Sequence, residues 1–180
     1  MAVTLVTTPG AADANSYVSV ADADAYFNNR LRVTAWTNAS ADDKGRALIM
    51  ATADLDANVE WDIAKTGWRT HRDGALEFPK VSVITRSGDA YYDKDTIPPF
   101  VVEYVCEQAL AHLVGERTTD VDARGIAAVT AGPVSVDFDT TVAGARKLST
   151  DRAWRAVSYW ATASGDVSAG TLRTVDLVRV

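Results

Sequence analysis

The stretch Asn15-Ser16-Tyr17-Val18-Ser19-Val20-Ala21-Asp22-Ala23-Asp24-Ala25-Tyr26-Phe27 decides how the chain begins to fold. Ser19 can accept hydrogen bonds from the backbone N–H groups that open a helix, and Asp22 places an acid in its first turn. Val18 and Ala23 have the spacing of a hydrophobic staple across the helix start. We therefore predict a capped helix over residues 20–29, with an apolar face made of Val20, Ala23, Tyr26 and Phe27.

Local signals predict three further helices. Ser40 and Asp43 repeat the capping pattern, and apolar residues recur at helical spacing after them, so a second helix should begin after Ser40. Pro98-Pro99 suits a helix start. Residues 99–116 are apolar over a wide arc, and we expect this helix to be the most buried one. A last helix is predicted over residues 150–163, where Ala153, Trp154, Val157 and Trp160 lie at helical spacing.

Short β-prone runs occupy much of the remaining chain. Residues 125–129 and 134–138 predict a hairpin, because apolar and polar residues alternate in the second run. Residues 76–78 and 81–84 are strand candidates bounded by turn residues. Residues 171–180 are β-prone but lack a local hairpin partner, which makes them a candidate for strand addition to another subunit.

These elements together predict a mainly α fold, namely a small helical bundle of about four helices with a β-hairpin arm and a C-terminal β-strand tail. A chain of 180 residues should bury about two-thirds of its unfolded surface, which allows one hydrophobic core. We expect residues 1–164 to form a helical domain that includes the hairpin arm at about residues 125–139. Residues 165–180 are predicted to be a strand-forming extension.

Composition restricts the classes of protein to which the chain can belong. The net charge of −6 and the pI of about 4.8 are unfavourable for a sequence-independent nucleic-acid binder, which usually carries a basic stripe. The single cysteine, Cys106, excludes a disulfide within the chain and lies in an apolar helical pattern. We find no signal-peptide pattern and no membrane-spanning run, and therefore expect a protein that stays in the cytoplasm unless it leaves inside a particle.

Residues for catalysis or metal binding do not occur in a recognisable pattern. The Asp-x-Asp pairs Asp22/Asp24 and Asp54/Asp56 lie in predicted helices, where the two carboxylates of a pair diverge and cannot share an ion. The two histidines, His71 and His112, lie far apart in sequence, and we expect His112 to be a packed or interface residue. Nucleotide-binding, hydrolase and Cys/His motifs are missing. The sequence predicts no enzyme, no metal and no cofactor.

A basic loop with tryptophans is the strongest candidate for a binding surface. Trp61 and Trp68 lie in a basic segment together with Arg69 and Arg72, which follow Trp68. Tryptophan next to arginine could stack bases of single-stranded DNA, or it could form the centre of a protein interface, where both residue types are enriched. Because the chain is acidic overall, we favour the protein interface, and the DNA alternative remains open.

Six sequence blocks in a fixed order carry a resemblance to a known family. The blocks are residues 15–27, Trp36 with the helix after Ser40, Trp61 with Gly67-Trp68-Arg69, Leu76-Glu77-Phe78-Pro79-Lys80, Ile97-Pro98-Pro99, and Gly132-Pro133-Val134-Ser135-Val136-Asp137-Phe138. Over residues 13–163 they resemble the tailed-phage head–tail connector (adaptor) proteins, a group also labelled "DnaT-like" phage proteins. Two features depart from that pattern: Phe78 stands where we expect Trp in many relatives, and the extension after residue 164 is longer.

The resemblance implies a structural virion protein at the neck, between head and tail. Such a subunit would form a closed ring, expected to contain twelve copies, beneath the portal protein. It would extend the DNA channel, let DNA pass without specific binding, and offer a face to a tail-terminator or other tail protein. The alternative is a single-stranded DNA-binding (DnaT-like) module. The predicted interface residues are Trp61, Trp68, Arg69, Arg72, Val134, Val136, Phe138, Leu172, Val175, Leu177, Val178 and Val180.

Overall fold

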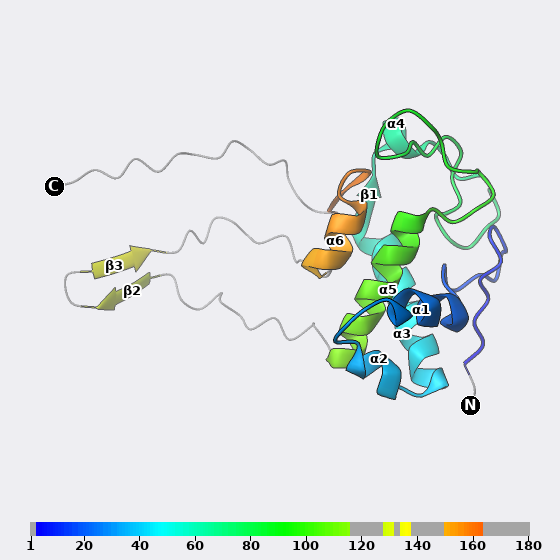
Figure 1. The fold of residues 1–180 in the computed structure, drawn as a ribbon. Helices are drawn as coiled ribbons and strands as arrows, with labels where there is room; N and C mark the ends of the chain where they lie inside the picture. Colours follow the sequence, from blue (N-terminus) through cyan, green and yellow to red (C-terminus); the bar gives the residue numbers. More distant parts are fainter. Residues whose placement is uncertain (1–2, 116–127, 132–133, 138–149, 164–180) are drawn as a thin grey trace.

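A computed structural model describes residues 3–115, 128–131, 134–137 and 150–163, and Figure 1 shows its fold. The described residues form a mainly helical structure, as predicted, with two small antiparallel sheets. The helices are α1 (Val20–Asn28), α2 (Thr34–Asn38), α3 (Ala41–Asn58), α4 (Ile63–Thr66), α5 (Pro99–Val114) and α6 (Asp151–Val157). The strands are β1 (Val59–Trp61), β2 (Ala128–Ala131), β3 (Val134–Asp137) and β4 (Ala161–Ala163).

The two predicted caps are present at the starts of α1 and α3. Ser19 Oγ accepts from the backbone N–H of Asp22 at 3.1 Å, and Ser40 Oγ accepts from that of Asp43 at 3.1 Å. Each side chain satisfies a backbone donor that the helix itself leaves free. The local sequence therefore fixes where both helices begin.

Helix α5 is the central helix of the described fold, as its apolar arc predicts. It packs against α3 on one side and α6 on another, and α1 and α2 also contact it (Figure 1). Pro99 occupies its first turn, and Val101, Tyr104, Val105 and Cys106 are completely buried. The helix ends at Val114 with Gly115 as its C-cap, whereas Glu116, the predicted end, lies outside the described residues. Burial of Cys106 raises the pKa of its thiol to about 12, which makes it an inert core residue.

The predicted last helix is wrong at its C-terminal end. Helix α6 stops at Val157, and the chain turns and pairs as β4 with β1, antiparallel, with Val59 opposite Ala163. Trp160 drives this turn, because its ring stacks on Phe100 at 3.9 Å between centroids and its Nε1 donates to the Ile84 carbonyl at 2.6 Å. Burying one large aromatic ring outweighs the weak helical preference of the residues around it.

The strand candidates at residues 76–78 and 81–84 are also wrong, because neither segment joins a ladder. They belong to an irregular segment with two isolated bridges, between Arg69 and Lys80 and between Ile84 and Tyr91. Side-chain burial rather than sheet pairing explains their β-prone composition, since Phe78 and Val83 are core residues. The short helices α2 and α4 were not predicted.

The predicted hairpin is confirmed at the level of the backbone. Strands β2 and β3 pair antiparallel, with Val129 opposite Val136 and Ala131 opposite Val134. The first strand runs from Ala128 to Ala131, so two residues that we assigned to the turn belong to the strand. The predicted C-terminal strand at residues 171–180 lies outside the described residues.

Candidate interface at the Trp68 loop

The segment between α4 and α5, residues 67–96, is here called the Trp68 loop. It begins at Gly67, whose φ of 63° lies in the left-handed region, and a Cβ at this position would lie 1.9 Å from the Val81 carbonyl oxygen. Glycine is therefore required by both the backbone angle and the close approach. The Val81 N–H donates to the Trp68 carbonyl at 2.8 Å, which fixes the backbone that carries Trp68.

A buried hydrogen-bond group fastens the Trp68 loop to α3 and to the segment that precedes α1. Tyr17 Oη donates to Asp56 Oδ1 at 2.7 Å and accepts from the Phe78 N–H at 3.1 Å. The other carboxylate oxygen of Asp56 accepts from the Glu77 N–H at 3.2 Å. Burial of Asp56 raises the pKa of its carboxyl to about 6, although these hydrogen bonds oppose the shift. The loop is thus held in place by an acid that is costly to ionise.

Trp61 is partly buried and packs against the core, although the sequence gives it the same candidate role as Trp68. Its ring packs edge-on against Phe78 at 4.7 Å and near Phe100 at 6.2 Å. The Lys80 ammonium lies 5.8 Å from the Trp61 ring centroid, and Lys80 is itself buried next to Glu77 at 3.2 Å. Trp61 therefore packs on aromatic residues of the core, and Trp68 is the more exposed of the two rings.

Arg69 has a structural task within the Trp68 loop. Its guanidinium donates to the carbonyl oxygens of Gly74 and, at 3.0 Å, of Leu76, and it lies 3.8 Å from a Glu77 carboxylate oxygen. An arginine that bonds two carbonyls of its own loop stabilises that loop's shape. Arg69 is half-buried and has little capacity left for a ligand.

Two aromatic rings and two arginines are among the exposed side chains of the Trp68 loop, together with four acids. Trp68 is 69% exposed and Tyr91 67% exposed, and Arg72 and Arg86 are exposed as well. Within the part of the chain that the structure describes, no ion-pair partner is recorded for either arginine. Tyr91 and Arg86 were not among the predicted interface residues, because the sequence does not show which aromatic and basic side chains of the loop are exposed. The exposed face of the loop thus offers two aromatic rings and two free guanidiniums.

The charge of this segment differs from that of the rest of the chain. Residues 62–95 contain equal numbers of cationic and acidic residues, so the whole net charge of −6 resides outside them. The cations are Lys65, Arg69, Arg72, Lys80, Arg86 and Lys94, and the acids are Asp62, Asp73, Glu77, Asp89, Asp93 and Asp95.

The remaining predicted interface residues are not assembled with the Trp68 loop by any described contact. Val134 and Val136 belong to β3. Phe138 and the C-terminal residues lie outside the described residues; these are Leu172, Val175, Leu177, Val178 and Val180.

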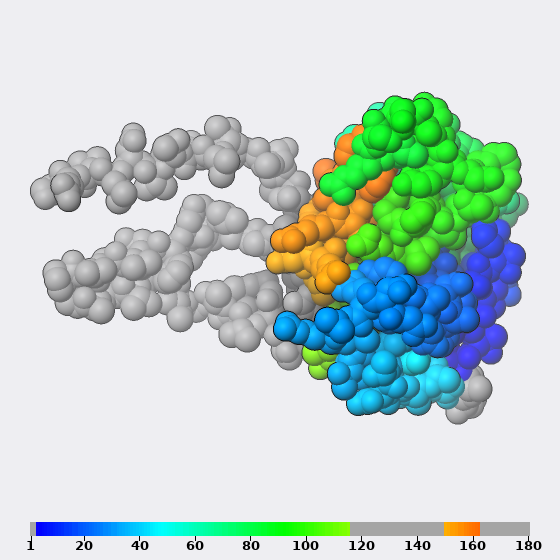
Figure 2. Space-filling view, in the orientation of Figure 1, coloured from blue at the N-terminus to red at the C-terminus, as the bar shows by residue number. Residues whose placement is uncertain are grey.

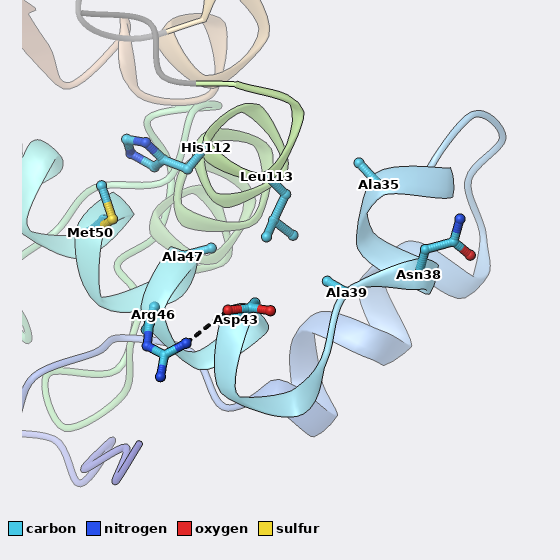
Figure 3. A pocket seen from close by; sticks show the side chains of 9 residues that line it. All are labelled: Ala35, Asn38, Ala39, Asp43, Arg46, Ala47, Met50, His112 and Leu113. Atoms are coloured by element: carbon cyan, nitrogen blue, oxygen red, sulfur yellow. Dashed lines mark hydrogen bonds and ion pairs between the residues drawn. The ribbon is translucent and has the colours of Figure 1, made fainter. Parts of the chain in front are cut away.

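An open hollow of about 500 Å³ lies between α2, α3 and α5 (Figure 3). Its floor is apolar, with Ala47 and Leu113, and Arg46 and Asp43 pair with each other at its rim at 2.8 Å. His112 borders it and is packed, as predicted, with Nε2 at 2.8 Å from Asp54 Oδ2. Burial raises the pKa of Asp54, but hydrogen bonds from His112 and Gln108 outweigh this effect and lower it overall. The described residues contain no cluster that could hold a metal ion.

Fold and loop together define a small, mainly helical domain with a loop that exposes aromatic rings and guanidiniums. A family model described as "Putative DnaT-like ssDNA binding protein" matches residues 1–179, and the chain belongs to this family. Neither a curated protein nor a solved structure matches the chain. The family match confirms the DnaT-like part of the resemblance, and the connector role stays a prediction. Among the described helices none is long and apolar enough to span a membrane.

Proposed function

We propose that the protein binds single-stranded DNA through the exposed face of the Trp68 loop. The observation that carries the proposal is Trp68 itself, a tryptophan that is 69% exposed on a backbone fixed by Gly67 and by the hydrogen bond from Val81. Such a ring is a stacking platform for a base of any identity. The description of the family as single-stranded DNA binding supports the same choice.

The charge distribution favours contact between DNA and the Trp68 loop, and it also limits the affinity that we expect. The acidic excess lies outside residues 62–95, so a polyanion meets less repulsion at the Trp68 loop than elsewhere on the chain. Arg72 and Arg86 are exposed there and can each meet a phosphate. Because only a few cations contribute, we expect modest affinity in which base stacking contributes as much as charge.

The experiment is an anisotropy titration of a fluorescent oligothymidylate at low salt with the wild type and Trp68→Ala. Base stacking contributes about 1–3 kcal/mol per base, so we expect the variant to bind at least about fivefold more weakly. Leu31→Ala is the matched control, because Leu31 is 90% exposed and lies in a different segment. If the wild type shows no binding at micromolar protein, or if both variants bind like the wild type, the proposal is wrong.

A second proposed function is the head–tail connector subunit of a tailed phage, a self-assembling ring under the portal protein in the neck of the virion. The hairpin of β2 and β3 favours it, because among the described residues these strands pair with each other in a two-stranded sheet. A two-stranded hairpin is marginally stable alone and gains from packing on a neighbouring subunit. Native mass spectrometry and electron microscopy with the portal protein test this role. A monomer that leaves the portal unbound contradicts it, and unchanged association after deletion of residues 166–180 excludes the tail as the docking segment.

A further inference from the structure

A second group of cations lies around α6, apart from the exposed face of the Trp68 loop. At its centre is Glu107 of α5, which is buried and accepts from Tyr26 Oη at 2.6 Å. The same carboxylate oxygen pairs with Arg30 and with Arg152 Nε, the latter at 3.3 Å. One carboxylate therefore faces two guanidiniums, and Glu103, one turn earlier on α5, is a second acid near them. Arg152 is 62% exposed, so its other N–H groups are open to a ligand.

The same helix face continues from Arg152 toward the Trp68 loop. Arg155 lies one turn further along α6, is exposed, and has no recorded ion-pair partner among the described residues. Residues three apart on a helix have Cβ atoms about 5–6 Å from each other, so the two guanidiniums are neighbours. Tyr159 follows at the end of this face, and its ring lies under Lys65 Nζ at 4.8 Å.

Lys65 connects this face to the Trp68 loop. Its ammonium donates to the Tyr159 carbonyl at 2.8 Å, and it lies in α4, three residues before Trp68. The pairing of β1 with β4 and the hydrogen bond from the Asp62 N–H to the Trp160 carbonyl, 2.9 Å long, hold the two segments together. Figure 1 shows α6 beside β1, with α4 beyond it. Arg152, Arg155, Lys65 and Trp68 thus follow one another on connected elements.

Acids near this face balance its cations. Asp62 pairs with Lys65 at 3.4 Å, Glu107 is shared by the two arginines, and Asp151 lies in the first turn of α6. With Glu103 of α5, whose charge acts on Tyr26 together with those of Arg30 and Arg152, four acids meet the four cations, in a chain whose net charge is −6. The cations are Arg30, Lys65, Arg152 and Arg155. The atoms of α6 lie on the surface of the face shown in Figure 2. An anion can reach them there.

We infer that the α6 face binds the phosphate groups of a nucleic-acid strand, with Arg152 and Arg155 each holding one phosphodiester. Arginine suits this task because its planar fork can donate two parallel hydrogen bonds to a phosphate. The strand would run from these phosphates, past Lys65, to a base stacked on Trp68. This inference rests on the proposed DNA binding and adds the site that holds the backbone of the strand.

Salt dependence separates phosphate contacts from stacking. For single strands, each phosphate contact contributes about 0.7 to the slope of log K against log salt. We expect Arg155→Gln to reduce this slope by about 0.7, and Arg152→Gln with Arg155→Gln to reduce it by about twice that amount. Trp68→Ala should weaken binding with an unchanged slope, because a stacked base releases no counterion. Labelled oligothymidylate titrated by anisotropy across a series of NaCl concentrations measures all three effects.

The control is Arg46→Gln, because Arg46 is 52% exposed and lies in α3, on the rim of the hollow in Figure 3. It should leave both affinity and slope unchanged. If the double variant unfolds, the salt slope of Arg155→Gln alone is the test. This single variant should fold, because Arg155 forms no ion pair with another described residue. Binding by the wild type with an unaltered slope in Arg155→Gln overturns the inference and leaves the proposed function intact. No binding by the wild type overturns both.

Discussion

Asp56 provides a direct test of how the Trp68 loop is held. Its carboxylate accepts from Tyr17 Oη at 2.7 Å and from the Glu77 N–H at 3.2 Å, and so joins α3 to the loop. Burial raises the pKa of this carboxyl from 3.8 to about 6. Asp56→Asn keeps one oxygen acceptor and removes the charge. We predict that this substitution abolishes a pH dependence of stability that the wild type shows in mildly acidic solution.

The sign and the size of the effect follow from the shift in the pKa of Asp56. The native state holds the proton more tightly than the unfolded chain, so its contribution to stability is complete below pH 3.8 and is lost as the pH rises through about 6. A shift from 3.8 to about 6 corresponds to about 3 kcal/mol. We expect the wild type to lose about this much unfolding free energy between pH 4 and pH 7, and Asp56→Asn to lose much less.

Other acids with shifted pKa values act in a different range. Hydrogen bonds from Lys44 and Ser40 hold the pKa values of Asp24 and Asp43 below their usual 3.8, so their contributions are lost only below that pH. Chemical denaturation of the wild type, Asp56→Asn and the exposed control Asp73→Asn at several pH values gives the comparison. If the wild type gains stability as the pH rises from 4 to 7, or if Asp56→Asn keeps the wild-type slope, the account of this anchor is refuted.

Two further substitutions test the packing that positions the loop. Gly67→Ala should cost about 1–3 kcal/mol in denaturation experiments, because φ is 63° and the new Cβ would lie 1.9 Å from the Val81 carbonyl oxygen. The reasoning fails if this variant is as stable as the wild type. Trp160→Ala should cost about 3–5 kcal/mol, because the ring stacks on Phe100 at 3.9 Å and donates to Ile84. Trp160→Phe should retain more of that stability, and an equal loss in both variants would argue against stacking as the cause.

Helices could be predicted from the sequence where their start is encoded locally. Ser19, Ser40 and Pro99 each provide a cap or a fixed backbone angle within one turn of the helix that they begin, and all three starts are confirmed. The end of α6 and the pairing of β1 with β4 were missed, because they depend on Trp160 meeting Phe100 from a distant part of the chain. A local pattern contains no signal for such a contact.

The sequence could locate the candidate binding surface, but it could not show which of its residues are exposed and which stabilise the fold. The basic segment with tryptophans identified the Trp68 loop. Trp61 and Trp68 have a similar sequence context, yet Trp61 packs on Phe78 whereas Trp68 is exposed. Arg69 likewise looked like a ligand contact and instead bonds the carbonyls of its own loop. The cations of α6 were not recognised, because Glu107 and Arg30 join them only in the folded structure.

The two proposed functions place different demands on Trp68, and this makes them separable. A DNA-binding module needs the ring free in the particle that binds DNA, whereas a ring subunit that uses Trp68 as an interface anchor would bury it between copies. In the second case oligothymidylate and self-association would compete for one surface, and excess oligonucleotide would shift rings toward monomers. If rings form and still bind DNA with the affinity of the monomer, Trp68 lies outside the subunit contact. Assembly would then depend on other surfaces, among which the hairpin of β2 and β3 is the one that gains most from a partner.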